Sequence, residues 1–160
     1  MLHVHIICVG KLKEKFYREA VAEYTKRLGG YCKLQLTELT EERLPQEPSQ
    51  AQIDAALAKE AAAIRAKLSQ GCRIVAMCVE GKEYSSPALA KLMDQQLQAG
   101  VKELVFLVGG SYGLDEELKK EAWARVSMSA MTFPHHLARV MLLEQVYRSF
   151  RILEGSAYHK

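Results

Sequence analysis

The chain of 160 residues has few of the residues that mark extracellular, membrane-bound or metal-binding proteins. It has four cysteines, Cys8, Cys32, Cys72 and Cys78, with neither C-x-x-C nor zinc-ligand spacing, and most of them lie in apolar runs. We therefore expect buried free thiols in a reducing compartment rather than disulfides or a zinc site. No apolar stretch approaches the ~20 residues of a membrane-spanning helix and no signal peptide is evident, so we expect a cytoplasmic protein.

Neither sign of charge is in large excess, since the formal net charge is only +3. With 49% apolar and 26% charged residues, the composition is that of a globular protein, which excludes a disordered or fibrous chain. The length suits a single domain over residues 1–160. Lysine and arginine are concentrated in residues 11–30 and 134–160. This asymmetry permits a polyanionic partner without requiring one.

Fingerprints of common nucleotide and hydrolase sites are missing. The glycine-rich segment Val108 to Leu114 lacks the Lys-Ser/Thr pair of a P-loop and does not fit G-x-G-x-x-G. The chain also has no G-x-S-x-G, H-E-x-x-H or paired-carboxylate motif. These absences argue against triphosphate binding and against the corresponding hydrolase reactions.

Short apolar runs alternate with helical patterns along the chain. Strands are predicted at Leu2 to Gly10, Tyr31 to Leu39, Arg73 to Val79, Glu103 to Val108 and Val126 to Met128. Helices are predicted at Lys11 to Leu28, Ala51 to Leu68, from a cap at Ser86 to Gln98, from a cap at Asp115 to Trp123, and at Leu137 to Leu153 after Pro134. This alternation indicates an α/β fold with a mostly parallel sheet, covered by helices on both faces. Gly81 is expected to start a turn, and Thr40 to Gln50 to be the most flexible segment.

Small and apolar residues lie at, or directly after, the carboxyl ends of three predicted strands. They are Met77, Gly109 and Gly110, and the nearly uncharged loop of Met128, Ser129, Ala130, Met131, Thr132 and Phe133. Open α/β sheets bind small molecules at the carboxyl ends of strands, and glycines let a ligand approach the backbone. A neutral pocket of this kind suits a nucleoside without phosphates. Tight turns that bind no ligand are the alternative.

The last predicted helix is apolar around more of its circumference than a surface helix. We expect it to be buried on two sides, one against its own sheet and one against a second subunit. Arg139 and Arg148 interrupt its apolar surface. Glu144 is placed to pair with Arg148 at i,i+4; alternatively, the two arginines hold phosphate at the mouth of a site.

Three further groups of polar residues are open to two interpretations each. His3 and His5 alternate onto one side of the first strand, and a structural role is favoured over metal binding because no third ligand lies near in sequence. The basic face of the first helix is either solvated or a phosphate contact surface. The C-terminal residues from Tyr158 are either a disordered end or part of a site.

Five segments of the chain form a combined pattern: VGKLK at 9–13, FLVGGSYGL at 106–114, SMSAMTFPHHLARV at 127–140, EQVYR at 144–148 and YHK at 158–160. Together they are similar to the ribosomal large-subunit methyltransferase H family, a small single-domain branch of the SPOUT superfamily. The resemblance extends over essentially the whole chain. Residues 40–70 are the least similar part and carry none of the pattern.

This resemblance implies a SPOUT-type α/β fold with a C-terminal deep trefoil knot, in an obligate homodimer. It implies that S-adenosylmethionine, without a metal, is bound in the knot by Met77, Gly109, Gly110, Met128, Ser129, Ala130, Met131, Thr132 and Phe133. It further implies a substrate: the N3 of a pseudouridine in the helix 69 hairpin of 23S rRNA, methylated on the assembled 70S ribosome.

Roles for polar residues follow from the same resemblance. The candidate catalytic residues are Tyr158, His159 and Arg139. The candidate RNA-binding residues are Lys11, Lys13, Lys15, Arg148 and Lys160, which would hold phosphates. A knotted tRNA methyltransferase, a non-catalytic ribosome-binding protein and a nucleotide-binding regulator are the alternative functions.

Overall fold

A computed structural model describes residues 1–159, in which five strands and five helices alternate along the chain. The strands are β1 His3–Val9, β2 Lys33–Leu39, β3 Arg73–Glu83, β4 Glu103–Val108 and β5 Ala124–Ser127. The helices are α1 Lys15–Leu28, α2 Gln50–Arg65, α3 Ser86–Gln98, α4 Glu116–Glu121 and α5 His135–Leu153. The predicted α/β alternation is confirmed. None of the described helices is both long and apolar enough to cross a membrane.

The five strands form one sheet in the order β2-β1-β4-β3-β5. Each pair of neighbouring strands is parallel, as predicted for most of the sheet. All five carboxyl ends therefore lie at one edge. The segments that follow β3, β4 and β5 meet there, although they are far apart in sequence.

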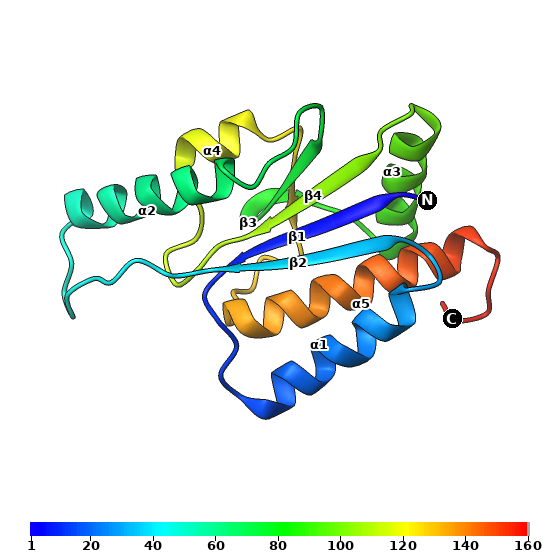
Figure 1. The fold of residues 1–160 in the computed structure, drawn as a ribbon, viewed down its shortest axis with the longest axis horizontal. Coiled ribbons are helices and arrows are strands. Elements are labelled where there is room, and N and C mark those ends of the chain that lie inside the picture. Colours follow the sequence, from blue (N-terminus) through cyan, green and yellow to red (C-terminus); the bar gives the residue numbers. More distant parts are fainter. Residues whose placement is uncertain (160) are drawn as a thin grey trace.

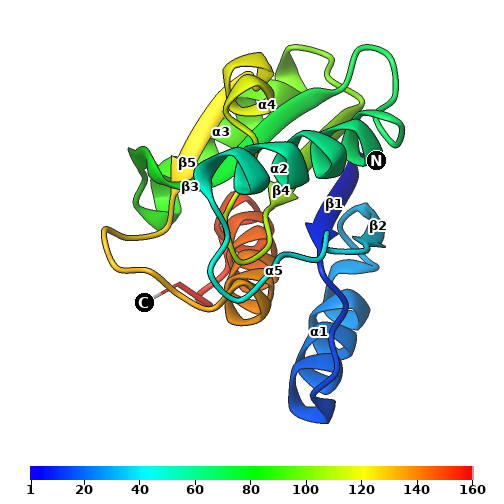
Figure 2. The same cartoon turned by 90° about the vertical axis from the view of Figure 1, so that its left-hand side faces the viewer.

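Helices cover both faces of the sheet (Figures 1 and 2), with α1, α3 and α5 on one face and α2 and α4 on the other. Alternate residues of β1 point to the two layers: Val4 and Ile6 face the first, Ile7 and Val9 the second. Fully burying each such side chain stabilises the fold by about 1.5–3 kcal/mol. This explains why β1 reads as a continuous apolar run.

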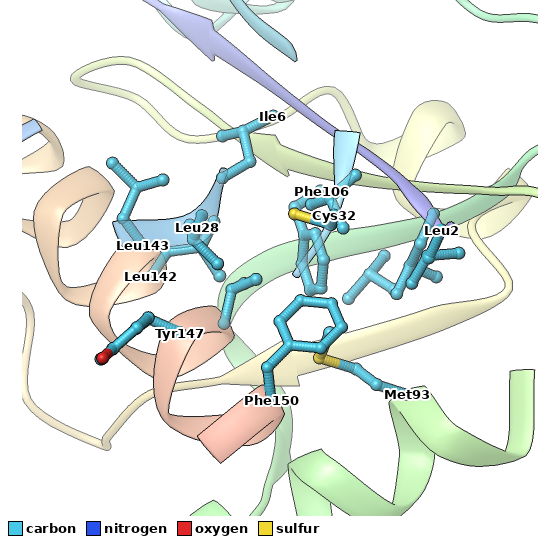
Figure 3. Close-up of a cluster of buried hydrophobic side chains, with 14 of the residues drawn as sticks. Leu2, Ile6, Leu28, Cys32, Met93, Phe106, Leu142, Leu143, Tyr147 and Phe150 are labelled. Atoms are coloured by element: carbon cyan, nitrogen blue, oxygen red, sulfur yellow. The ribbon is translucent and has the colours of Figure 1, made fainter. Parts of the chain in front are cut away.

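The larger apolar layer lies between the sheet and α5. Figure 3 shows Phe106 of β4 near Met93 of α3 and Phe150 of α5. Leu142 and Leu143 of α5 are fully buried in the same cluster. This packing fixes α5 beneath the sheet, with its first turn toward the carboxyl edge.

Four predicted helix starts were wrong. Helix α2 begins at Gln50 rather than Ala51, and α5 begins at His135 rather than Leu137. The other two have a visible cause. Helix α1 begins at Lys15 rather than Lys11, because the Leu12 N–H is drawn to the Glu38 carboxylate (2.9 Å) and the chain remains a loop up to Glu14. The cap of α3 is Ser85 rather than Ser86, since the Ser85 hydroxyl accepts the Ala88 N–H. Pro87, which lacks an N–H, fits in this first helical turn.

Strand β3 is longer than predicted. It was expected to end at Val79 with a turn from Gly81, but it continues to Glu83 after a shift of register against β5 between Met77 and Lys82. A Cβ atom on Gly81 would lie 2.8 Å from the backbone of Arg125 and Val126, so glycine allows the close approach of the two strands. The residues between Met77 and Gly81 bulge toward the carboxyl edge.

The remaining differences concern element ends. β5 begins at Ala124 and ends at Ser127, α4 ends at Glu121, and α2 ends at Arg65. The expected flexible segment up to Gln50 contains no strand, and only its last residue is helical. It is nevertheless anchored, because the Glu42 N–H donates to the buried Glu60 carboxylate at 2.9 Å.

Candidate functional site

A cavity of about 650 Å³ lies at the carboxyl edge of the sheet, where β3, β4 and β5 end. Its walls are the bulged part of β3 at residues 77–80, the glycine turn 109–113, and the loop that leads from β5 into α5. The volume falls in the range of small-molecule sites, and the place in the fold is where open α/β sheets bind ligands. We call it the donor cavity, after the methyl donor that the sequence resemblance places among these residues.

Most of the predicted pocket residues line the donor cavity. They are Met77, Gly109, Gly110, Met128, Met131, Thr132 and Phe133. Ser129 and Ala130 belong to the same loop but do not line the cavity. Ser129 instead shapes the loop: its hydroxyl accepts the Met131 N–H (3.0 Å), and its carbonyl accepts the Ser127 hydroxyl (2.9 Å).

The glycine turn is closed on itself. The Gly113 N–H donates to the Gly110 carbonyl at 3.1 Å, and Gly113 has a φ of +80°. A Cβ atom on Gly109 would lie 2.4 Å from the Gly113 backbone, so only glycine fits there. From outside, Glu41 accepts the Ser111 N–H at 2.7 Å. The segment after β2 thus supports the turn, a role that the sequence pattern did not indicate.

Glu80 and Lys119 are cavity residues that were missed. Lys119 is only 7% exposed, and its ammonium pairs with the carboxylates of Glu80 and Glu116. Burial opposes the charge of Lys119, but these hydrogen bonds outweigh burial and raise its pKa, while Lys119 lowers the pKa of Glu80. The sequence could have indicated Glu80, because it directly follows the predicted end of the third strand. It gives no such indication for Lys119, which lies within a short helix.

His135, at the start of α5, also lines the donor cavity. Burial lowers its pKa, and the adjacent His136 lowers it further. The His135 imidazole is therefore uncharged at pH 7. The HH pair was part of the recognised pattern, but neither residue was predicted as a site residue.

Arg139 does not line the donor cavity and is only 2% exposed. Its guanidinium donates to the Glu38 carboxylate and to the Gly10 carbonyl (2.8 Å). Arg139 was predicted to contact phosphate or to act in catalysis. In this chain its guanidinium is buried and bound to these two partners, so it is not accessible to a substrate. Through these two bonds Arg139 links α5 to Gly10, directly after β1, and to Glu38, near the end of β2.

The other predicted catalytic residues, Tyr158 and His159, come after α5 in the chain and fold back against it. The Tyr158 hydroxyl donates to Glu144 at 3.3 Å, and the His159 ring lies 3.2 Å from a guanidinium nitrogen of Arg148. The predicted Glu144–Arg148 pair is present, with a closest distance of 2.6 Å. Neither Tyr158 nor His159 lines the donor cavity of its own chain.

The predicted RNA-binding lysines of the N-terminal region are exposed. Lys11 and Lys13 lie in the loop before α1, and Lys15 begins the helix with Glu19 at 3.6 Å. Lys160 lies outside the described residues. Arg148 is engaged by Glu144 and is less available to phosphate than these lysines.

The N-terminal histidines sit at the opposite edge of the sheet from the donor cavity. His5 is buried, with Nε2 2.8 Å from the Thr37 hydroxyl and Nδ1 3.4 Å from Glu103. This is the structural arrangement favoured from sequence. Among residues 1–159, no group of three or more His, Cys, Asp or Glu side chains is placed to hold a metal ion. The four cysteines are free; Cys8 and Cys32 are buried, and Cys72 and Cys78 are half-buried.

Helix α5 is buried toward the sheet and half-buried elsewhere. Leu137, Val140, Met141 and Ile152 are apolar but only partly covered, and Leu153 is 39% exposed. Met141 and Glu144 border a second cavity of about 280 Å³, which shares Met77, Val126 and Met128 with the donor cavity. The second apolar side of α5 is therefore unpartnered within one described chain.

Comparison with known proteins assigns the family. The family model described as "Predicted SPOUT methyltransferase" matches residues 2–159. The chain is 43% identical over 159 residues to the ribosomal RNA large subunit methyltransferase H of Streptococcus thermophilus strain CNRZ 1066, which covers 99% of this chain and all of that protein. It is 41% identical, with the same coverage, to the protein of that name from Streptococcus equi subsp. zooepidemicus strain MGCS10565. The donor cavity thus lies in a chain that belongs to the SPOUT methyltransferase family.

Proposed function

We propose that this protein transfers a methyl group from S-adenosylmethionine to N3 of a pseudouridine in the helix 69 hairpin of 23S rRNA, on the assembled 70S ribosome. The observation that carries the proposal is the donor cavity, with its glycine turn and uncharged loop. Relatives named ribosomal RNA large subunit methyltransferase H, similar over the full length, support rRNA as the substrate class. The exposed lysines before and in α1 agree with a polyanionic substrate.

The residues of the donor cavity fit the donor. Its volume accommodates a nucleoside with an amino-acid arm, and the turn that floors it has no side chain at Gly109 and Gly110. Met77, Met128 and Phe133 offer apolar surface to the adenine, and exposed backbone groups of the loop offer hydrogen bonds to its edge. When bound, the sulfonium of the donor supplies an electrophilic methyl group.

The protein then has to align the pseudouridine N3 and accept its proton. Burial and the nearby Glu144 raise the pKa of Tyr158, so its phenol stays protonated at neutral pH and donates a hydrogen bond. The imidazole of His159 is therefore the candidate acceptor for the N3 proton. Tyr158 positions the base, and Arg139 positions the start of α5 rather than the substrate.

We also propose a homodimer, and retain the trefoil knot as a prediction for the C-terminal region. The half-buried apolar side of α5 supports the dimer. Glu144, which holds the Tyr158 hydroxyl, is nine residues from His135, or about 14 Å along a helix. Two α5 helices packed antiparallel about a two-fold axis would bring the tail of one chain to the donor cavity of the other.

The test is transfer of labelled methyl from S-adenosylmethionine to 70S ribosomes, free large subunits and tRNA, with the modified nucleoside identified by mass. We expect label on the pseudouridine of 70S ribosomes. Deleting residues 158–160 should preserve donor affinity in calorimetry and abolish transfer. Label on tRNA instead would identify a knotted tRNA enzyme. Ribosome binding without transfer, independent of the donor, would identify a binding protein and overturn the proposal.

A further inference from the structure

Phe16 is a large apolar side chain in an unusual place. It lies in the first turn of α1 and is 63% exposed, whereas the apolar side of the helix is covered by α5 and the sheet. A single exposed aromatic needs no explanation by itself. What distinguishes Phe16 is that its ring begins a series of rings that leads to the donor cavity.

Four rings follow one another across two helices. The centroids of Phe16 and Tyr17 are 4.4 Å apart, those of Tyr17 and His136 6.0 Å, and those of His136 and His135 4.2 Å. His135 lines the donor cavity. We call these four residues the aromatic track. Figure 1 shows the reason for it, since the first turns of α1 and α5 lie at the same end of the molecule.

Positive charge borders the track. Lys11, Lys13, Lys15 and Arg18, all within five residues of Phe16 in the sequence, are exposed. The carboxylates in this part of the chain have partners of their own: Glu14 lies 3.6 Å from His136, and Glu19 lies 3.6 Å from Lys15. A third carboxylate, Glu38, accepts the Leu12 N–H but is neutralised by Arg139. Four cations against Glu14 and Glu19 leave an excess of positive charge, which attracts phosphate.

We propose that the aromatic track stacks unpaired nucleotides of the rRNA loop that flank the target base, with Phe16 as the outermost stacking residue. The proposal rests on the proposed function. Aromatic faces interleaved with Lys and Arg are the usual means of binding single-stranded RNA, because each base can stack while its phosphate is neutralised. Continuity with the donor cavity orients the strand, so that the nucleotide stacked on Phe16 lies away from the reacting base.

The charge around Phe16 selects RNA over an apolar protein partner. Protein interfaces have centres depleted of charged residues, and lysine in particular is rare in them. Here four exposed cations lie within five residues of one exposed ring in the sequence. The half-buried His135, whose lowered pKa keeps it neutral, can stack on a base without an added charge at the cavity.

The experiment measures methyl transfer to 70S ribosomes by Phe16→Ala, Phe16→Leu and Phe16→Trp. Loss of one stacked base, worth about 1–3 kcal/mol, raises the ribosome KM by about 5- to 150-fold in Phe16→Ala, with kcat unchanged. Phe16→Leu keeps apolar bulk without a π-face and should be as defective as Phe16→Ala, whereas Phe16→Trp should be active. Trp123→Ala removes an aromatic of 39% exposure elsewhere and should leave KM unchanged.

Salt dependence separates stacking from charge. Lys13→Gln should reduce the slope of log KM against log salt, because one fewer counterion is released, while Phe16→Ala should shift KM at every salt concentration with an unchanged slope. A wild-type KM in Phe16→Ala, or full rescue by Phe16→Leu, would overturn the stacking proposal; the latter would indicate an apolar protein contact. Either result leaves the proposed function standing if the wild-type enzyme still labels the ribosome. As a control, the donor affinity of each variant, measured by calorimetry, shows that the variant is folded.

Discussion

At position 109 a side chain would collide with the backbone of the same turn, not only with a ligand. The Cβ of an alanine would lie 2.4 Å from the Gly113 carbonyl group, and backbone cannot yield as a side chain can. At Gly110 the nearest atom is a carboxylate oxygen of Glu41 at 2.6 Å, which can swing away at the cost of its bond to Ser111. The two neighbouring glycines therefore differ in how much they constrain the site.

We predict that Gly109→Ala weakens binding of S-adenosylmethionine by at least about fivefold, because overpacking of about 1–3 kcal/mol distorts the cavity floor. Gly110→Ala should have a smaller effect. Isothermal calorimetry measures both, and Gly30→Ala is the matched control because a Cβ there meets no atom within 4 Å. Unchanged affinity in Gly109→Ala would refute the placement of the donor.

Which single residues could be predicted follows from the kind of signal that each one gives. Gly109, Met77 and the loop from Met128 lie at, or directly after, the carboxyl ends of predicted strands, and the carboxyl edge of a parallel sheet brings such positions together. Glu41 and Lys119 reach the site through side-chain contacts that depend on where α2 and α4 pack. No periodicity in the sequence encodes those contacts.

At the scale of elements, the sequence pattern located every helix and strand but misjudged places where the backbone departs from regular geometry. The apolar run of β3 ends at Val79, so the strand was predicted to end there. Pairing with β5 resumes at Lys82, after a bulge that tertiary contact with Arg125 and Val126 imposes. Likewise, the loop before α1 has a helical apolar period, but Glu38 of a neighbouring strand binds its Leu12 N–H.

The bulge gives a prediction about how β3 and β5 hold each other. Gly81→Ala would place a Cβ 2.8 Å from three backbone atoms of β5, so the edge strand must move. We expect the free energy of unfolding in urea to fall by about 1–3 kcal/mol, measured at one fixed protein concentration. Val79→Ala, which shortens a half-exposed side chain on the same bulge, should change it by less than about 0.5 kcal/mol. Equal stability of the two variants would contradict the close packing of these strands.

At the scale of the whole molecule, one chain holds two parts of the proposed site at different ends of α5. The donor cavity adjoins His135, while Tyr158 and His159 fold against Glu144 and Arg148. The wide apolar surface of α5 was readable from sequence as a sign of a second partner. The sequence does not indicate which end of such a partner would meet the cavity, because this depends on the direction in which two copies of the same helix would pack.

A mixed dimer tests that direction. One chain lacks residues 158–160 and keeps its cavity; the other carries Gly109→Ala and keeps its tail. With S-adenosylmethionine held well below the Kd of the Gly109→Ala variant, each homodimer is expected to be nearly inactive in methyl transfer to 70S ribosomes. The mixed dimer is isolated with two affinity tags. If the tail serves the partner's cavity, this dimer combines one intact cavity with one intact tail. It then recovers about half of the wild-type activity, since one of two symmetric sites is complete. If the tail serves its own cavity, neither chain is complete and the mixed dimer stays inactive. We expect recovery, because the tail of a single chain is held at Glu144, about 9 Å of helix beyond Ala138, the last α5 residue that lines its own cavity.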